Sequence, residues 1–253
     1  MEHRIRSTAS EPRAAGERPL PGVFGDPVSR ETISRQAYQA IRTSLMRSRL
    51  RPGQKLIARD VARDLGISIT PVREALLRLV AEHGLELDER GTVVVPVLDL
   101  ERCLELRDLR ILIEGEGAAR AARRATRTEI DALKEIHRRY VQTEQSDDLA
   151  TALAENENFH FALCRMAKSP ALERIVQNLW MQFGPVLSYL YEGGGRPFHG
   201  RRHGHLIVIE ALLKRDEEAA RRAIGQDILI GGAAVLESLQ AKPARRGVAG
   251  SRP

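Results

Sequence analysis

Two short apolar patterns separated by a glycine constrain the fold of this chain more than any other feature. The apolar residues of 55–65 share one helical face, and Gly66 follows them as a C-terminal cap. Ser68 or Thr70 can cap a second helix that carries Pro71 in its first turn. Two short helices joined by Leu-Gly-Ile-Ser have the spacing of a helix-turn-helix.

The residues on both sides extend this motif. An apolar stripe at four-residue spacing predicts a helix from Arg30 that ends near Leu50, because Pro52 and Gly53 follow. After Gly84, two short apolar runs flank a charged turn at 88–91, which predicts a two-stranded hairpin. Residues 29–97 are therefore expected to form a winged helix-turn-helix domain.

The rest of the chain is predicted to be helical. Only 4% of the residues are aromatic, and alanine, leucine, arginine and glutamate dominate, which favours helices. Helices are expected over 99–122, 128–143, 147–167, 170–191, 199–215 and 217–240. The sequence thus predicts a mainly α protein in which an all-α six-helix (or seven-helix) bundle fills 98–240. Residues 1–28 and 241–253 have no apolar periodicity and are expected to be a disordered arm and a disordered basic tail.

Charge divides the chain in the same way. Residues 29–97 hold 12 basic and 8 acidic side chains (+4), and residues 98–240 hold 20 basic and 22 acidic ones (−2). A basic N-terminal part suits a phosphate backbone. The longest apolar stretch, 228–236, is far shorter than the roughly 20 residues of a membrane span. With no secretory signal and only Cys103 and Cys164, expected as buried apolar residues, a cytoplasmic location without membrane contact is predicted.

The second helix of a helix-turn-helix enters the major groove of DNA, so its first residues are candidates for base and phosphate contacts. Residues of the preceding helix and the hairpin turn flank it. The candidates are Arg59, Ser68, Ile69, Thr70, Arg73 and Arg90. Two simpler alternatives stay open: Arg73 pairs with Glu74 or Glu82 on the surface, or Arg90 only solubilises a turn.

Four polar residues in the helical part have the spacing of metal ligands. Asn156 and His160 lie on one helical face, and Asp227 follows His205 by 22 residues on the next helix. Two imidazoles and one carboxylate from three helices can hold a divalent cation in a bundle core. Histidines that are simply satisfied within the core are the commoner explanation of such spacing.

The N-terminal motif resembles the DNA-binding signature of the GntR family of bacterial transcription regulators. The matching runs are 51–56, 60–68 and 70–76. The resemblance implies that Arg59, Ser68, Thr70, Arg73 and the turn Arg90-Gly91 contact double-stranded operator DNA. Many members carry an arginine where this chain has Ile69, which suggests an operator that differs at the matching position, with a thymine methyl against Ile69.

The helical part resembles the FCD effector domain of the FadR subgroup of that family. The matching segments are 106–114, 156–160, 170–180 and 205–216. Many members bind a metal through an Asp and three His. The resemblance therefore implies a divalent cation, such as zinc, nickel or manganese, at Asn156, His160, His205 and Asp227, with the carboxylate at Asp227 instead of position 156.

The resemblance also places the first bundle helix against the effector pocket. Arg110 on that helix can bind a carboxylate effector, although an ion pair with Glu114 on the surface explains it as well. Of the other histidines, His199 and His203 are expected in a loop and His137 on the surface.

Taken together, the sequence predicts a homodimeric, DNA-binding transcription regulator, not an enzyme, whose operator affinity responds to a small carboxylate effector. A two-fold operator calls for a two-fold protein. One alternative is a metal-dependent enzyme that uses the His/Asp site for hydrolysis or isomerisation. Another is an architectural DNA-binding protein that takes no ligand.

Overall fold

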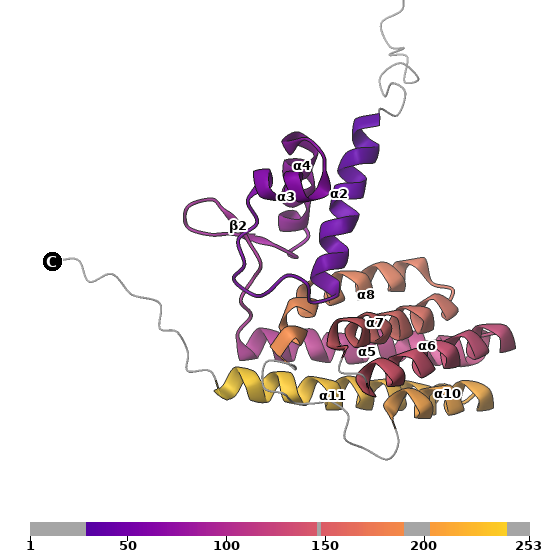
Figure 1. Cartoon of the computed structure of the whole chain (residues 1–253). Helices are drawn as coiled ribbons and strands as arrows, with labels where there is room; N and C mark the ends of the chain where they lie inside the picture. The colour runs from indigo at the N-terminus through magenta and orange to yellow at the C-terminus, as the bar shows by residue number, and fades with distance from the viewer. Residues whose placement is uncertain (1–28, 146–147, 190–202, 242–253) are drawn as a thin grey trace, which may run out of the picture.

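The computed structural model describes residues 29–145, 148–189 and 203–241. Helices α2 (Ser29–Met46), α3 (Ala58–Leu65) and α4 (Ile69–Ala81) and strands β1 (Glu86–Leu87) and β2 (Val93–Val94) form the winged helix. Helices α5 (Leu100–Arg124), α6 (Arg127–Gln145), α7 (Leu149–Met166), α8 (Pro170–Phe183), α10 (Gly204–Lys214) and α11 (Glu217–Ala241) and the 3₁₀ turn η1 (Gly184–Ser188) form the bundle. The mainly α fold with an N-terminal winged helix-turn-helix is confirmed (Figure 1).

The winged helix is built on the packing of α2 against α4. Leu45, Val72 and Leu79 are fully buried between these helices. Helix α3 ends at Gly66, whose φ of 66° lies in the left-handed region that glycine adopts at low cost. The antiparallel hairpin pairs Glu86 with Val94.

The prediction of a helix from Lys55 is wrong by three residues. Lys55 forms an isolated bridge to Val94, and the Leu56 N–H donates to the Val93 carbonyl over 2.8 Å. Because the hairpin uses the backbone of this segment, helix α3 begins only at Ala58.

The ends of the bundle helices correct several expected boundaries. Asp99 caps α5 as predicted, its Oδ1 accepting from the Arg102 N–H over 2.8 Å. Helix α6 is capped by Thr126 and not by Thr128: the Thr126 hydroxyl accepts from the Glu129 N–H, and the Glu129 carboxylate accepts from the Thr126 N–H.

The helix predicted over 170–191 and the helix predicted from residue 199 are both shorter in the structure. Helix α8 ends at Phe183, where the 3₁₀ turn that contains Pro185 begins, because proline has no N–H to continue the helix. Helix α10 begins at Gly204. Residues 1–28 and 190–202 and most of the predicted tail lie outside the described residues.

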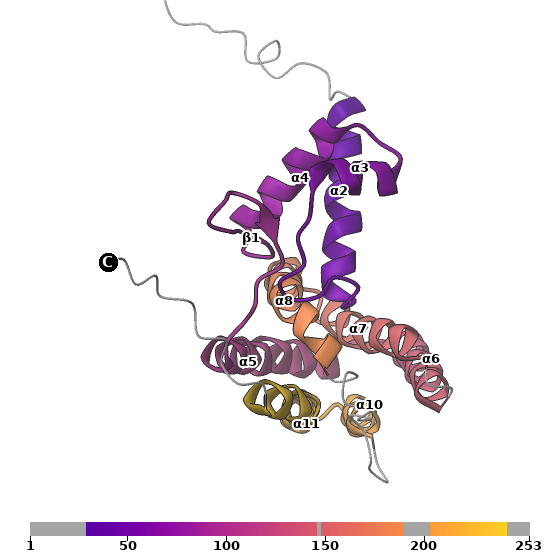
Figure 2. The same ribbon diagram turned by 60° about the vertical axis from the view of Figure 1, so that its left-hand side comes forward.

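The two parts contact each other at the C-terminal end of α2 and at the two residues that follow it, Arg47 and Ser48. Figures 1 and 2 show the lower end of α2 reaching the α7–α8 side of the bundle, while α5 and α11 lie side by side on the far side. The Arg47 guanidinium lies 2.8 Å from the Glu157 carboxylate, and the Ser48 hydroxyl donates to the Gly184 carbonyl over 2.6 Å. None of the described helices is long and apolar enough to cross a membrane.

Candidate functional site

The predicted DNA contacts on α4 are exposed. Ser68 is the N-cap residue of α4, yet its hydroxyl makes no capping bond within the described residues. Ile69 is 36% exposed, and Thr70 and Arg73 follow it on the exposed first turns of the helix. Arg73 forms no ion pair with any described residue, and the Glu82 carboxylate pairs with Arg78 over 3.0 Å. The structure therefore does not support the surface pairing of Arg73 considered above.

The other two predicted contacts lie on α3 and on the hairpin. Arg59 is the second residue of α3 and is exposed. At the hairpin tip, Asp88 Oδ1 accepts from the Thr92 N–H over 2.8 Å and from the Arg90 N–H over 3.0 Å. The Thr92 N–H above all lowers the pKa of Asp88. Gly91 takes a φ of 74°, which the tight turn requires. The turn is thus fixed by its own backbone, while the Arg90 side chain remains exposed.

Three of the four predicted metal ligands come together inside the bundle. His160 on α7, His205 on α10 and Asp227 on α11 are 2%, 0% and 3% exposed, and one candidate ligand atom of each lies within 4.8 Å of the others. The Asp227 Oδ2 atom lies 3.3 Å from His160 Nε2 and 3.8 Å from His205 Nε2. An added side-chain carbon at Gly204 would collide with Asp227, so the first residue of α10 must be glycine for the carboxylate to fit.

Three atoms of this cluster, Asp227 Oδ1 and both ring nitrogens of His205, are buried without a hydrogen-bond partner among the described residues. The Oδ1 of Asn156, the fourth predicted ligand, lies one helical turn before His160 on α7 and is also buried without such a partner. Leaving such atoms unpaired is costly, and each unpaired group calls for an explanation, such as an ion or ligand. Oxygen and imidazole donors suit zinc, nickel or manganese. The residues present therefore fit a divalent cation.

A buried acid that the sequence did not single out adjoins the cluster. Glu114 on α5 is 1% exposed, and its Oε2 lies 2.6 Å from His160 Nδ1. Its Oε1 accepts from Arg110 Nε over 2.7 Å and from Trp180 Nε1 over 3.0 Å. Metal-binding histidines commonly donate their second ring N–H to a carboxylate in this way, which fixes the tautomer and leaves Nε2 for the metal.

The charges around Glu114 determine its ionisation. Burial raises its pKa, but the positive charge of Arg110 and then the contact with His160 lower the pKa of Glu114 to about 2. Burial alone would lower the pKa of His160. The negative charges of Glu114 and Asp227 outweigh this effect, so the pKa of His160 is raised.

The predicted effector residue, Arg110, is already engaged. It pairs with Glu114, as the alternative proposed, but the pair is buried and not on the surface: the two side chains are 5% and 1% exposed. The Arg110 guanidinium also stacks 4.2 Å over the Trp180 ring.

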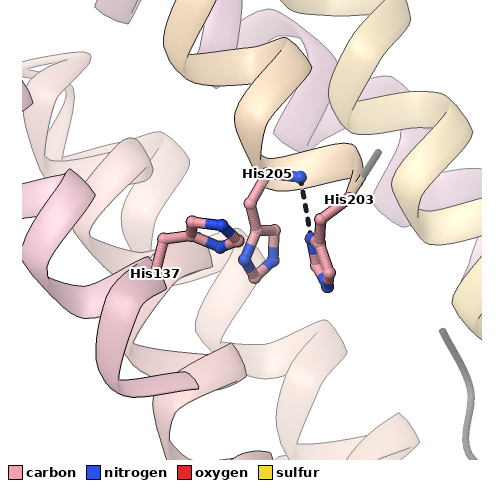
Figure 3. A group of neighbouring side chains, drawn as sticks. All are labelled: His137, His203 and His205. Carbon is pink, nitrogen blue, oxygen red and sulfur yellow. Dashed lines mark hydrogen bonds between the residues drawn. The ribbon is translucent and has the colours of Figure 1, made fainter. Parts of the chain in front are cut away.

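The prediction for one further histidine is wrong: His137, expected on the surface, is 8% exposed on α6. His203, expected in a loop, lies outside the helices as the extended N-cap residue of α10. The His203 Nδ1 accepts from the His205 N–H over 3.1 Å. One candidate ligand atom each of His137, His203 and His205 lies within 4.8 Å of the others (Figure 3). The signal was present in the sequence, because His137 lies four residues after Leu133 and three before Tyr140 on the buried face of α6. His199 lies outside the described residues.

Comparison with known proteins agrees with this architecture. The model described as "Bacterial regulatory proteins, gntR family" matches residues 33–95, and the FCD domain model matches residues 105–229. The transcriptional regulator McbR of Escherichia coli K12 is 29% identical over 197 residues, which cover 77% of this chain and 89% of the relative. An HTH-type regulator of Agrobacterium vitis is 30% identical over 152 residues, covering 59% of this chain and 89% of the relative.

A solved structure shows the same arrangement. E. coli McbR/YncC superposes with a TM-score of 0.74 at 29% identity and covers 80% of this chain and 95% of that chain. These relatives are transcription regulators, so the alternative of a metal-dependent enzyme is not supported. The chain belongs to the bacterial GntR family and is a transcription regulator with an FCD domain.

Proposed function

We propose that this regulator binds a two-fold DNA operator as a homodimer, and that a small carboxylate effector controls its affinity through a divalent cation in the bundle. The observation that carries the proposal is the buried cluster of His160, His205 and Asp227, in which acceptor atoms lack hydrogen-bond partners among the described residues.

DNA binding is supported by exposed hydrogen-bond donors at the start of α4, the second helix of the helix-turn-helix. The Ser68 and Thr70 hydroxyls and the N-terminal end of α4 suit phosphate oxygens, and the Arg73 guanidinium suits a guanine edge. Arg59 and Arg90 would flank α4 and contact the backbone. Ile69 would read a thymine methyl where relatives with arginine read a polar edge.

On the effector side, Asn156, His160, His205 and Asp227 would hold the cation. When bound, the cation supplies positive charge and open coordination positions that a carboxylate can fill. Glu114 would hold His160 in the tautomer that leaves Nε2 available.

Through Arg110, the effector would bind one arrangement of the bundle helices more tightly than another. Its guanidinium already pairs with Glu114, so an effector carboxylate that binds Arg110 has to compete with that residue. The competition loosens a contact between α5 and α7, because Glu114 also binds His160. A ligand that contacts one helix arrangement better than another shifts the population between them.

The homodimer is supported by exposed apolar side chains on the neighbouring helices α5 and α11. Leu109 and Leu112 on α5 are 37% and 65% exposed, and Leu229 and Ile230 on α11 are 36% and 55% exposed. Large apolar side chains in water favour an interface with a second copy.

The test combines metal content with DNA binding of the full-length protein. Operator DNA selected from random duplexes is titrated by fluorescence anisotropy at fixed salt, with and without each member of a panel of small mono- and dicarboxylates. In parallel, elemental analysis measures bound metal. His160→Ala, His205→Ala and Asp227→Ala are expected to abolish the carboxylate response while leaving the effector-free DNA affinity nearly intact.

Two controls sharpen the comparison. Asn156→Ala should weaken the response less, since a neutral amide is a weaker ligand than a carboxylate. His83→Ala changes an exposed histidine of the winged helix and should alter neither metal content nor response. If the wild-type protein holds no stoichiometric metal and the His160 variant still responds, the metal-dependent proposal is refuted.

A further inference from the structure

Three imidazole rings from separate places in the bundle meet beside the cluster described above. His137 comes from α6, His203 precedes α10, and His205 lies in its first turn. Figure 3 shows the His205 ring between the rings of His137 and His203. The ring centroids of His203 and His205 are 4.4 Å apart, and that of His137 lies 5.1 Å and 5.5 Å from them.

The surroundings of the three rings are mostly aromatic. Phe159 stacks on His205 with its centroid 3.6 Å away, and Tyr140 contacts the rings of His203 and His205 at 5.0 Å and 5.2 Å. The His137 Nδ1 and both ring nitrogens of His205 are buried without a hydrogen-bond partner among the described residues. Stacking explains the packing of the rings but not these unpaired polar atoms, which in an apolar setting are costly.

We propose that His137, His203 and His205 form a second metal site, which takes a zinc, nickel or copper ion through three imidazole nitrogens. Imidazole ligands suit these ions, whereas the carboxylate-containing group of His160 and Asp227 also suits manganese. His205 belongs to both groups. As a neutral ring it gives one nitrogen to one ion, and it can ligate both ions only after losing its ring N–H proton to form a bridging imidazolate. His137 and His203 are not ligands in the proposed function, so changes at these two residues test the second site separately from the effector response.

Filling the site has one structural consequence. The His203 Nδ1 now accepts the capping bond from the His205 N–H. Coordination through the His203 Nε2 moves the ring proton to Nδ1, and a protonated Nδ1 can no longer accept that bond. Metal binding is therefore coupled to the start of α10.

The experiment disables each group separately in the full-length protein. His160→Gln with Asp227→Asn removes the first group, His137→Gln with His203→Gln removes the second, and a third protein carries all four changes. Each is stripped with a chelator, loaded with zinc or nickel and desalted before elemental analysis. Far-UV circular dichroism checks helicity, and His83→Gln serves as the control because His83 is exposed on the winged helix.

The protein with only the first group removed is expected to retain one zinc per chain, and the four changes together should weaken zinc binding at least 100-fold. Manganese should bind neither protein. Loss of all zinc from the first variant, or retention by the four-change protein, overturns the proposal. Failure of the proposed function looks different: the His160 and Asp227 changes would then leave the carboxylate response of DNA binding intact.

A measurement on the unsubstituted protein covers the case in which a variant does not fold. Nitrogen-15 NMR of the imidazole rings reports coordination directly. Zinc is expected to shift a ring nitrogen of His137, which the first group does not use. A His137 ring whose nitrogens are unchanged at saturating zinc overturns the proposal.

Discussion

Glu114 stabilises the bundle through buried charge, and its replacement by Gln gives a quantitative test. In the unfolded chain a Glu has a pKa near 4.5, and in the structure the pKa of Glu114 is about 2. A difference of about 2.5 units corresponds to about 3 kcal/mol of stability at pH 7. Removing one partner of a buried ion pair costs about 3–5 kcal/mol, which agrees. Glu114→Gln should therefore lower the free energy of unfolding by about 3 kcal/mol.

The single tryptophan of the chain, Trp180, allows unfolding to be followed next to Glu114. Trp180 is 1% exposed and donates to Glu114, so its fluorescence reports the packing around this acid during urea unfolding. Glu116→Gln is the matched control on the same helix. The Glu116 side chain is 38% exposed and pairs with Arg120 and Arg221, so its loss should cost less than about 1 kcal/mol.

The pH dependence has a definite sign. A folded-state pKa below the unfolded value contributes stability above pH 4.5 and loses it as the pH falls toward 2. The difference between the wild type and Glu114→Gln should shrink from about 3 kcal/mol at pH 7 to about 1 kcal/mol at pH 3. Equal costs of Glu114→Gln and Glu116→Gln at pH 7, or a difference that does not change with pH, would refute the reasoning.

Three further outcomes are expected. Arg73→Ala should weaken specific operator binding by about 1–3 kcal/mol, measured by fluorescence anisotropy at fixed salt, and an unchanged affinity removes Arg73 from the contacts. Leu112→Glu should give a monomer by light scattering at micromolar concentration. The control Ile175→Glu, which changes an exposed residue of α8 in the same way, should remain dimeric. A dimeric Leu112 variant argues against an interface on α5 and α11. Arg47→Met breaks the contact with Glu157 and should reduce the effector-dependent change in DNA affinity without altering effector-free binding; a full response would show that this contact carries no signal.

The winged helix was predictable because its signals are local. A glycine after a short helix, a charged turn between apolar runs and apolar residues at regular spacing act within a few residues of each other. The segment at Lys55 was misjudged because its partner, Val94, lies far along the chain. The cap at Thr126 is also a local signal, because Thr126 and Glu129 form a Thr-x-x-Glu pattern that Thr128 does not offer.

The metal and effector site in the bundle was only partly predictable, because burial there depends on contacts between helices that are far apart in the sequence. His160, His205 and Asp227 were found from their spacing, and the fold brings them together. The burial of Arg110 with Glu114 was missed, because i, i+4 spacing gives the pair but not which face of α5 is covered. His137 was placed on the surface because its neighbours in sequence are charged, although its packing partners belong to α10.

Helix α7 offers a direct connection between the cluster and the winged helix. Asn156 and His160 are one turn apart on the side of α7 that meets the cluster, while Glu157, next to Asn156, pairs with Arg47, which directly follows α2. The winged helix and the bundle are therefore connected by this ion pair as well as by the chain segment 96–99. Since α2 packs against α4, a small rotation of α7 changes the support of the recognition helix. Packed helices have few alternative arrangements, so we expect a shift at the cluster to select between positions of α4 on DNA.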